Sequence, residues 1–434
     1  MTLFSISRFG LAFCLAILPT ALSAESLWSG VSDESDIKEI RGFSAKLEVT
    51  DSEKSLVLTG LEVSDHSYRW ASIPAPGGSW DLAKSKAVES QISNEGTAPV
   101  EVMFWAVGTH GWSGVGDFAK LAPGESRRFA CALQETYPDG AAKVNPAEMV
   151  KLQLMVRSNA SDLKIRINES KATGEAIEWV RPPGRLEVPA VEKGAPTAGR
   201  RVQYQVPNES WPGIFGALYL PLDWERGKVY PVIVEYPGNI FFNQKCYSTG
   251  RPDQCDMGYG MSEGKGAIWL SLPFIDRDRG MIVENGFGNA DDTMNLCLDS
   301  VADIIARYGG DPDNLILTGF SRGSIACGYI GLRTDEIGRL WKGIHGCQHY
   351  DGSSWKESNM SDAVERAKRF RGKAIYQTDN SQEKYQPVVD ATASDVKWTW
   401  DQSGLGFHAT AMFLDDRPAT LRLRKWYREL IQSP

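Results

Sequence analysis

The sequence predicts an all-β sandwich followed by a domain built on a mostly parallel sheet flanked by helices. Two patterns predict these folds. Short alternating apolar and polar runs, separated by turn residues, extend to about residue 180, and apolar strands alternate with amphipathic helices afterwards. Residues 181–200 are rich in Pro, Gly and Ala without a periodic apolar pattern, which indicates a linker. The sandwich is therefore expected at residues 25–180 and the second domain at residues 201–434.

The first 24 residues have the three parts of a secretory signal peptide. Arg8 supplies the positive charge, residues 9–18 form the apolar core, and residues 21–24 (Ala-Leu-Ser-Ala) provide the small residues of a cleavage site. The apolar run is too short for a membrane helix and ends at Pro19. We expect cleavage at the end of this segment and a periplasmic or secreted protein without stable membrane insertion.

Charge and cysteine usage limit the classes of partner. The net charge is −8 and the chain carries no basic stripe, so we expect no nucleic-acid partner. Seven cysteines become six once Cys14 leaves with the signal peptide, and an exported protein can form disulfides. Cys246 and Cys255 share one loop and are the best candidate pair. No C-x-x-C motif or His/Cys cluster indicates zinc, and we expect no metal and no other cofactor.

The first domain shows the period-2 alternation of strands with one buried and one wet face. Glycine, proline and asparagine clusters mark the turns between the runs, so we expect a sandwich of roughly jelly-roll type. The clearest strand candidates are residues 55–59, 100–105, 127–131, 150–155 and 163–167.

The order of these features resembles the carbohydrate-binding jelly rolls attached to many polysaccharide-degrading enzymes. The resemblance is carried by residues 79–82, 88–92, 94–96, 99–105 and 121–125. It implies a sugar-binding role, and tryptophan faces stack well on sugar rings. A purely structural role, with the tryptophans in the core, is the alternative. The tryptophans in question are Trp70, Trp80, Trp105 and Trp112.

In the second domain, four strand candidates precede a helix and the central strand. Helical spacing of apolar residues predicts a helix over residues 292–308, and the apolar run 315–317 suits a strand buried on both faces. A further helix is expected at residues 417–431. The strand candidates are residues 203–207, 214–220, 229–236 and 267–272, with 373–377 and 397–400 later in the chain.

The motif Gly319-Phe320-Ser321-Arg322-Gly323 follows the central strand directly and fits the G-x-S-x-G nucleophile elbow. A serine on so tight a strand-to-helix turn adopts a strained backbone, and side chains two residues away on either side would collide. The helix expected at residues 324–332 directs its positive dipole end toward the serine. Ser321 is therefore our candidate nucleophile, and an ordinary tight turn is the alternative.

A serine hydroxyl needs a base, and the base needs an orienting acid; in the α/β-hydrolase fold these follow in the order Ser, Asp or Glu, His. His408 stands in the glycine-bearing loop beyond the last predicted strand and is the candidate base. Asp379 follows strand 373–377 and is the candidate acid, with Asp390 and Asp395 as rivals. Asp379 could instead be a turn former.

An oxyanion hole needs two donors where negative charge develops. The amide of Arg322 supplies one, and Gly238 or Asn239, after strand 229–236, is expected to supply the other.

Residues 308–323 resemble secreted α/β-hydrolases of the feruloyl-esterase and polyhydroxybutyrate-depolymerase type, and prolyl-oligopeptidase relatives share parts of the pattern. The resemblance covers residues 200–434 and implies an α/β-hydrolase fold and acyl chemistry. The arginine directly after the serine also resembles the arrangement in glucuronoyl esterases, where the arginine side chain helps to hold the oxyanion. Phe320 replaces their cysteine, and a structural salt bridge is the alternative role for Arg322.

Further substrate-binding candidates follow from their position. His345 and His349 lie near the carboxyl end of a predicted strand, the edge at which such sheets bind ligands. Trp269, Phe274 and Trp355 are candidates for lining the cleft, with core packing as the alternative.

Together these features predict an exported serine carboxylic-ester hydrolase. The attached sandwich favours a polysaccharide or oligosaccharide ester as substrate, one that carries an acyl, feruloyl or uronoyl group. This expectation rests on the association of such sandwiches with polysaccharide-degrading enzymes. A serine peptidase of prolyl-oligopeptidase type and a non-catalytic carbohydrate-binding protein remain the alternatives.

Overall fold

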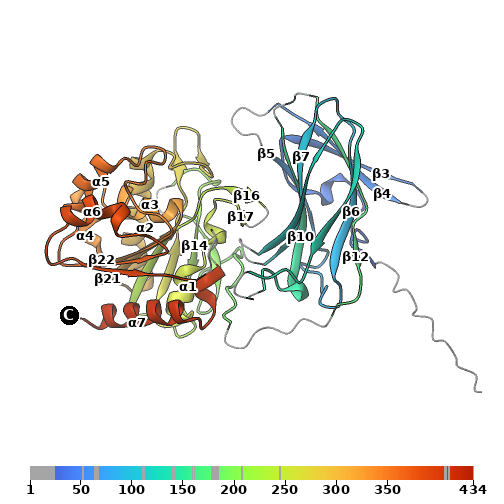
Figure 1. The fold of residues 1–434 in the computed structure, drawn as a ribbon. Helices are drawn as coiled ribbons and strands as arrows, with labels where there is room; N and C mark the ends of the chain where they lie inside the picture. The colour runs from blue at the N-terminus through green and yellow to red at the C-terminus, as the bar shows by residue number, and fades with distance from the viewer. Residues whose placement is uncertain are drawn as a thin grey trace, which may run out of the picture.

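Figure 1 shows the fold of the protein in a computed structural model. It describes residues 25–433 apart from short gaps, so the expected signal peptide lies outside the described residues. The gaps are residues 51–52, 63–67, 110–112, 138–139, 141, 159, 161, 177–184, 207–208, 244–245, 405–407 and 409–410.

The first domain consists of two antiparallel sheets that enclose one apolar core. Apolar side chains from both sheets, such as Leu58, Val88, Phe104 and Leu154, are almost completely buried between them. The predicted sandwich architecture is therefore confirmed. One sheet holds β1 Glu25–Ser26, β3 Phe43–Val49, β4 Lys54–Gly60, β6 Ala87–Asn94, β9 Ser126–Ala132, β11 Lys164–Asn168 and β12 Lys171–Thr173. The other holds β2 Lys38–Arg41, β5 Tyr68–Pro74, β7 Val100–Gly108, β8 Gly114–Leu121 and β10 Met149–Arg157.

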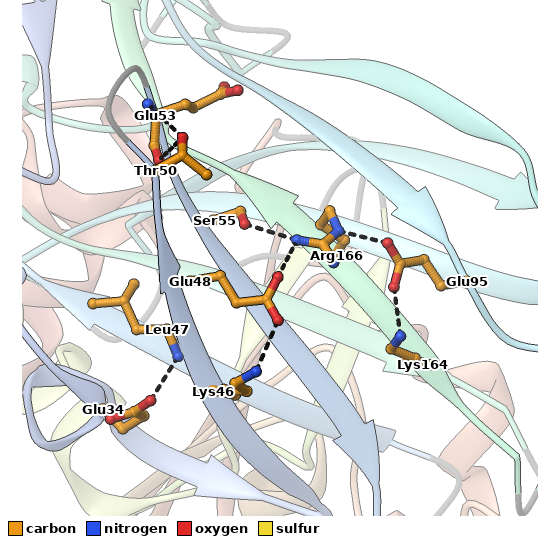
Figure 2. Close-up of polar contacts among 10 residues, drawn as sticks. All are labelled: Glu34, Lys46, Leu47, Glu48, Thr50, Glu53, Ser55, Glu95, Lys164 and Arg166. Carbon is orange, nitrogen blue, oxygen red and sulfur yellow. Dashed lines mark hydrogen bonds and ion pairs between the residues drawn. The ribbon is translucent and has the colours of Figure 1, made fainter.

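The outer face of the first sheet is polar, as period-2 alternation requires. Ile165 and Ile167 of β11 are buried, whereas Arg166 between them joins a network of ion pairs on the surface (Figure 2). Its guanidinium contacts Glu48 at 2.8 Å and Glu95 at 2.5 Å. Such a solvated network contributes little stability, and its main effect is to keep this face wet.

The second domain contains an eight-stranded sheet within the described residues. Its order is β13-β14-β18-β15-β21-β22-β23-β24. β14 pairs antiparallel with both β13 and β18, and the remaining pairs are parallel. This order, with its helical crossovers, is that of the α/β-hydrolase fold. The strands are β13 Arg201–Tyr204, β14 Gly216–Tyr219, β15 Tyr230–Tyr236, β18 Ile268–Ser271, β21 Gly310–Phe320, β22 Trp341–Cys347, β23 Ala374–Thr378 and β24 Lys397–Asp401.

Helices cover both faces of this sheet because its central strands are apolar on both sides. Leu315 and Leu317 pack with α2, α3, α5 and α6, while Ile316 between them packs with α1 and α7 on the opposite face. The α-helices are α1 Met257–Ser262, α2 Ala290–Tyr308, α3 Arg322–Tyr329, α4 Asp335–Leu340, α5 Met360–Ala367, α6 Gln386–Ala391 and α7 Pro418–Gln432. Short 3-10 helices are η1 Glu34–Asp36, η2 Pro146–Glu148, η3 Pro252–Gln254, η4 Glu383–Tyr385 and η5 Ala411–Leu414.

The described part of the expected linker runs along the second domain. The amide of Leu186 donates to the carbonyl of Leu414, and isolated bridges join Glu192 to Val202 and Ala198 to Leu220. Residues 177–184, where the chain leaves the sandwich, lie outside the described residues.

A short hairpin of the second domain packs against the sandwich. It consists of β16 Phe241–Asn243 and β17 Cys246–Ser248 and lies between the two domains (Figure 1). Trp105 of β7 meets Tyr247 edge-on at a centroid distance of 5.1 Å, and the Tyr247 hydroxyl donates to Gln153 at 2.6 Å. The outer face of the five-stranded sheet is therefore covered where this hairpin rests on it.

This contact decides the position of Trp105, which is 2% exposed and therefore cannot stack on a sugar. Trp70 is half-buried beneath the guanidinium of Arg41 at 4.7 Å, and Trp80 packs partly against the sandwich core. Trp112 lies outside the described residues.

The expected pairing of Cys246 with Cys255 is wrong. All six cysteines in the described part of the chain are buried free thiols. Cys246 lies on β17 in the hairpin, whereas Cys255 ends η3 among Arg201, Glu235 and Ser271. Both side chains belong to the same buried apolar cluster, yet the two sulfurs are not bonded to each other.

The described ranges hold neither a candidate membrane helix nor a candidate metal site. No helix there is long and apolar enough to cross a membrane. No group of three or more His, Cys, Asp or Glu side chains there is arranged to hold a metal ion.

Truncation of Trp105 tests the domain contact. We expect Trp105→Ala to lower the free energy of unfolding by roughly 3–5 kcal/mol, because the indole fills a buried site between two domains. Trp211→Ala, at a tryptophan that is 46% exposed, serves as the control and should have little effect. Urea unfolding followed by circular dichroism measures both, and equal losses for the two variants would contradict the described packing.

Candidate active site

The nucleophile elbow has the backbone geometry that its sequence predicts. Ser321 links β21 to α3 with φ 54° and ψ −116°, a conformation that is strained for a residue with a side chain. A Cβ atom at Gly319 would lie 2.2 Å from the carbonyl carbon of Gly323. The two glycines of the motif therefore face each other across the turn.

Gly323 also allows α3 to approach the neighbouring strand. A Cβ atom there would lie 2.0 Å from the carbonyl oxygen of Tyr236, the last residue of β15. Since backbone cannot yield as a flexible side chain does, only glycine fits at this position. The close approach brings Ser321 beside the loop that follows β15.

His408 lies within hydrogen-bonding distance of the serine. Its Nε2 is 2.8 Å from Ser321 Oγ, and its ring packs on Phe320 at a centroid distance of 4.6 Å. Burial and, to a smaller extent, the nearby His349 lower the pKa of His408 to about 4. The imidazole is therefore neutral at pH 7, and with its proton on Nδ1 it can accept the serine proton at Nε2.

Asp379 directly follows β23, as expected, and has φ 56°. Its carboxylate accepts the amide of Ser403 at 2.6 Å and also the Ser403 hydroxyl, with Gln348 Nε2 at 3.3 Å. Ser403 stands in the loop that leads to His408. No interaction recorded for the described residues joins the Asp379 carboxylate to the imidazole, so the two are connected through this loop. The rival Asp390 accepts from Gln386 on α6.

The Arg322 side chain has neither of its expected partners. Its guanidinium donates to four backbone carbonyls at 2.8–2.9 Å and lies 4.1 Å from the centre of the Phe274 ring. It is 1% exposed and makes no ion pair within the described parts of the chain, and burial lowers its pKa to about 9. A structural salt bridge is therefore wrong, and the guanidinium is occupied by carbonyls rather than directed at an oxyanion. The four carbonyls that accept from the guanidinium belong to Gly238, Gly250, Val283 and Gly286.

The backbone amide of Arg322 remains a candidate oxyanion donor. It opens α3, where an amide has no acceptor within its own helix. Gly238, the next candidate, is fixed by Arg322 and by Gln254, which both donate to its carbonyl. Asn239 lines the cavity, and its side chain accepts the amide of Gly286 at 2.9 Å. Both candidates therefore stand in a loop that Arg322 holds close to the serine.

A cavity of about 380 Å³ opens in front of Ser321 and His408. Of the predicted substrate-binding residues, His349 and Trp355 line it. Its complete lining is Asn239, Phe241, Cys246, Ser248, Phe320, Ser321, Arg322, Ile325, His349, Ser353, Ser354, Trp355, Lys384 and His408.

Two other predicted substrate-binding residues, His345 and Trp269, lie in the core. His345 is completely buried between Thr318 at 2.9 Å and Thr378 at 3.1 Å, and burial lowers its pKa to about 3. Trp269 is also completely buried, and its Nε1 donates to Glu235 at 2.9 Å. Both side chains point into the layers beside the sheet, so neither can contact a substrate. Phe274 is likewise buried, beneath Arg322.

Sequence reasoning missed the hairpin side of the cavity and the residues opposite it. Phe241, Cys246 and Ser248 come from the β16–β17 hairpin. Residues 241–248 carry a usable hairpin signal, with two short runs on either side of a polar turn. Ser353 and Lys384 carry no such signal, because Ser353 comes from an irregular segment and Lys384 from the single turn of η4.

Comparisons with known proteins support no family assignment. A scan against protein-family models finds no match, and no curated protein matches. Among solved structures, the chain is similar to inhibited esterase B from Lactobacillus rhamnosis (15% identity, 53% of this chain and 86% of that chain, TM-score 0.37). It is also similar to an esterase of Rhizomucor miehei (11% identity, 53% of this chain and 82% of that chain, TM-score 0.37). A third similar structure is a putative carboxylesterase from Lactobacillus plantarum (15% identity, 53% of this chain and 98% of that chain, TM-score 0.37). The fold assignment rests on the strand order given above.

Gly323→Ala tests the elbow packing. We expect it to lower the free energy of unfolding by roughly 1–3 kcal/mol or more, because its methyl group would collide with the Tyr236 carbonyl. Gly338→Ala in α4 is the matched control: the nearest atom, Arg369 Cβ, is 3.4 Å away, and alanine favours a helix. Urea midpoints compare the two. A Gly323→Ala protein as stable as the control would show that α3 does not pack this closely.

Proposed function

We propose that this protein is an exported serine carboxylic-ester hydrolase. The observation that carries the proposal is the 2.8 Å contact between Ser321 Oγ and a neutral, buried His408, on a strained elbow that faces a cavity. A serine with an adjacent base on such a turn is the arrangement needed for nucleophilic acyl transfer.

In the proposed reaction, Ser321 Oγ attacks the ester carbonyl carbon while His408 Nε2 takes its proton. The carbonyl oxygen becomes an oxyanion, which the amide of Arg322 and an amide at Gly238 or Asn239 would stabilise. The bond to the alcohol then breaks, and His408 returns the proton to the leaving oxygen. Water repeats the sequence on the acyl-enzyme, which releases the acid and regenerates the serine.

Asp379 acts as a positioning residue in this proposal. Its carboxylate binds both the amide and the hydroxyl of Ser403 and so fixes the loop from which His408 projects. A base displaced by about 1 Å from its productive position can lose about 10²-fold in rate. The acid would thus support the base through the loop, without a direct ion pair.

The proposed substrate is an ester that decorates a polysaccharide or oligosaccharide, with an acyl, feruloyl or uronoyl group. The cavity offers both apolar surface, from Phe241 and Trp355, and hydroxyl and amide groups, from Ser248 and Asn239. That mixture suits a sugar ester. An exported location follows from the signal-peptide pattern in the first 24 residues.

Replacement of the nucleophile tests the proposed function. The mature protein should hydrolyse 4-nitrophenyl acetate, and Ser321→Ala should lower kcat by roughly 10⁴-fold or more, because acyl-enzyme formation is lost. Ser354→Ala, which removes another cavity hydroxyl, is the control for a general effect on the site and should leave kcat nearly unchanged. Equal activity of wild type and Ser321→Ala would refute the assignment of the nucleophile.

The pH profile tests how Asp379 acts. His408 must be neutral to accept a proton, so kcat/KM should stay level as the pH falls from 7 and then decline around pH 4. Asp379→Ala should lower kcat/KM by roughly 10²-fold without moving this midpoint, because no ion pair to the imidazole is lost. Asp390→Ala is the control.

A direct Asp379–His408 pair would give a different result. Such a pair would raise the wild-type midpoint well above 4, and Asp379→Ala would then shift it downward. That outcome would overturn the indirect role through Ser403.

A further inference from the structure

One wall of the active-site cavity is built from two segments that are far apart in sequence. The loop after β22 carries His349 and Ser353, and η4 carries Lys384. The amide of Tyr350 donates to the Tyr385 hydroxyl at 3.0 Å, and the two rings meet edge-on at 6.1 Å. Because both tyrosines are at most 1% exposed, this contact fixes the two segments to each other.

Lys384 is an exposed cation on this wall, and no ion pair recorded for the described residues includes it. Its ammonium group lies 5.2 Å from the ring centre of its neighbour Tyr385. Its charge acts on the cavity, because burial and, to a smaller extent, Lys384 lower the pKa of His349 to about 4. The wall therefore combines a positive charge with a neutral imidazole.

Two acids of this part of the fold are bound elsewhere. Asp351 is held by two nitrogens of the Arg366 guanidinium, Nε and Nη2, at 2.7 and 2.9 Å, and by Ser358. Asp379 is occupied by Ser403 and Gln348. Neither carboxylate is recorded as a contact of Lys384, and Glu383, its neighbour on η4, forms no recorded ion pair with it either within the described residues.

Polar groups beside Lys384 also lack hydrogen-bond partners. The Nδ1 atom of His349 and the Oγ atom of Ser353 are buried without a recorded partner. The His349 backbone is nevertheless held firmly, because its carbonyl accepts from Ser324 Oγ and from Asn380 Nδ2. Its ring lies 5.4 Å from that of His408, centroid to centroid. Unpaired polar groups in a rigid wall are costly unless a ligand satisfies them.

We propose that Lys384, His349 and Ser353 form a subsite for a carboxylate group of the substrate, separate from the ester that is cleaved. This inference rests on the proposed esterase function and narrows its substrates to anionic esters. The carboxylate would form an ion pair with the ammonium group of Lys384 and accept hydrogen bonds from the neutral imidazole of His349 and the hydroxyl of Ser353. An acidic sugar that carries the ester and a half-ester of a dicarboxylic acid both present such a group.

Two pairs of synthetic esters distinguish these sources. Mono-4-nitrophenyl succinate carries its carboxylate on the acyl side, and 4-acetoxybenzoate carries it on the alcohol side. The methyl ester of each is its neutral twin. For at least one pair, kcat/KM should be on the order of ten-fold higher for the anion than for the twin, and the responsive pair shows on which side of the scissile bond the subsite lies.

Variants of Lys384 then test the origin of the preference. The ratio of anion to twin should fall to near 1 in Lys384→Gln and below 1 in Lys384→Glu. It should be unchanged in Lys425→Gln, whose lysine lies exposed on α7. Added salt should weaken the wild-type preference, because it screens the charge. A wild-type ratio near 1 for both pairs, or a preference that Lys384→Glu retains, would overturn the subsite while leaving the esterase function intact.

Binding gives a readout that does not depend on turnover. Calorimetric titration of 4-hydroxybenzoate into Ser321→Ala should give a Kd that rises about ten-fold when Lys384→Gln is added. If the subsite lies on the acyl side, the Kd of monomethyl succinate, and not that of 4-hydroxybenzoate, should rise when Lys384→Gln is added to Ser321→Ala. If no ester is hydrolysed but this dependence on Lys384 is found, the proposed function fails and the carboxylate subsite stands. If neither ligand shows the dependence, the subsite fails.

Discussion

The buried guanidinium of Arg322 connects the parts of the candidate active site. It donates to carbonyls of the loop after β15, of the segment before η3 and of the segment before α2, while its own backbone begins the helix that follows Ser321. A buried charge is unfavourable unless dipoles replace its hydration shell. Four carbonyl oxygens and the face of Phe274 take that role, so the charge orders loops that have no regular structure of their own.

The sandwich contributes to the same arrangement from the other side. The β16–β17 hairpin has one row of side chains against the sandwich, including Phe242 and Tyr247. The alternate positions Phe241, Cys246 and Ser248 line the cavity. Because neighbouring residues of a strand face opposite ways, packing against Trp105 fixes the position of the cavity wall. The first domain is thus a structural part of the site.

The sequence was sufficient to predict features that depend on local pattern. Period-2 alternation located strands such as β4 and β11, and the glycines of the elbow predicted the turn at Ser321. The position of His408 in the loop beyond the last predicted strand made it the candidate partner of Ser321, and the two side chains are in contact. Features that depend on where a side chain points could not be predicted in this way. His345 and His349 are four residues apart, yet one lies inside the sheet and the other faces the cavity. The position of Lys384 likewise depends on a tyrosine contact across 35 residues.

Covalent labelling tests whether Ser321 is an activated nucleophile. The mature protein is treated with a fluorophosphonate at pH 7, digested, and analysed by mass spectrometry. We expect one phosphonyl group per chain, on the peptide that contains Ser321, with labelling abolished in Ser321→Ala and strongly slowed in His408→Ala. Labelling at another serine, or a Ser321 that stays unmodified while the protein is folded, would contradict it.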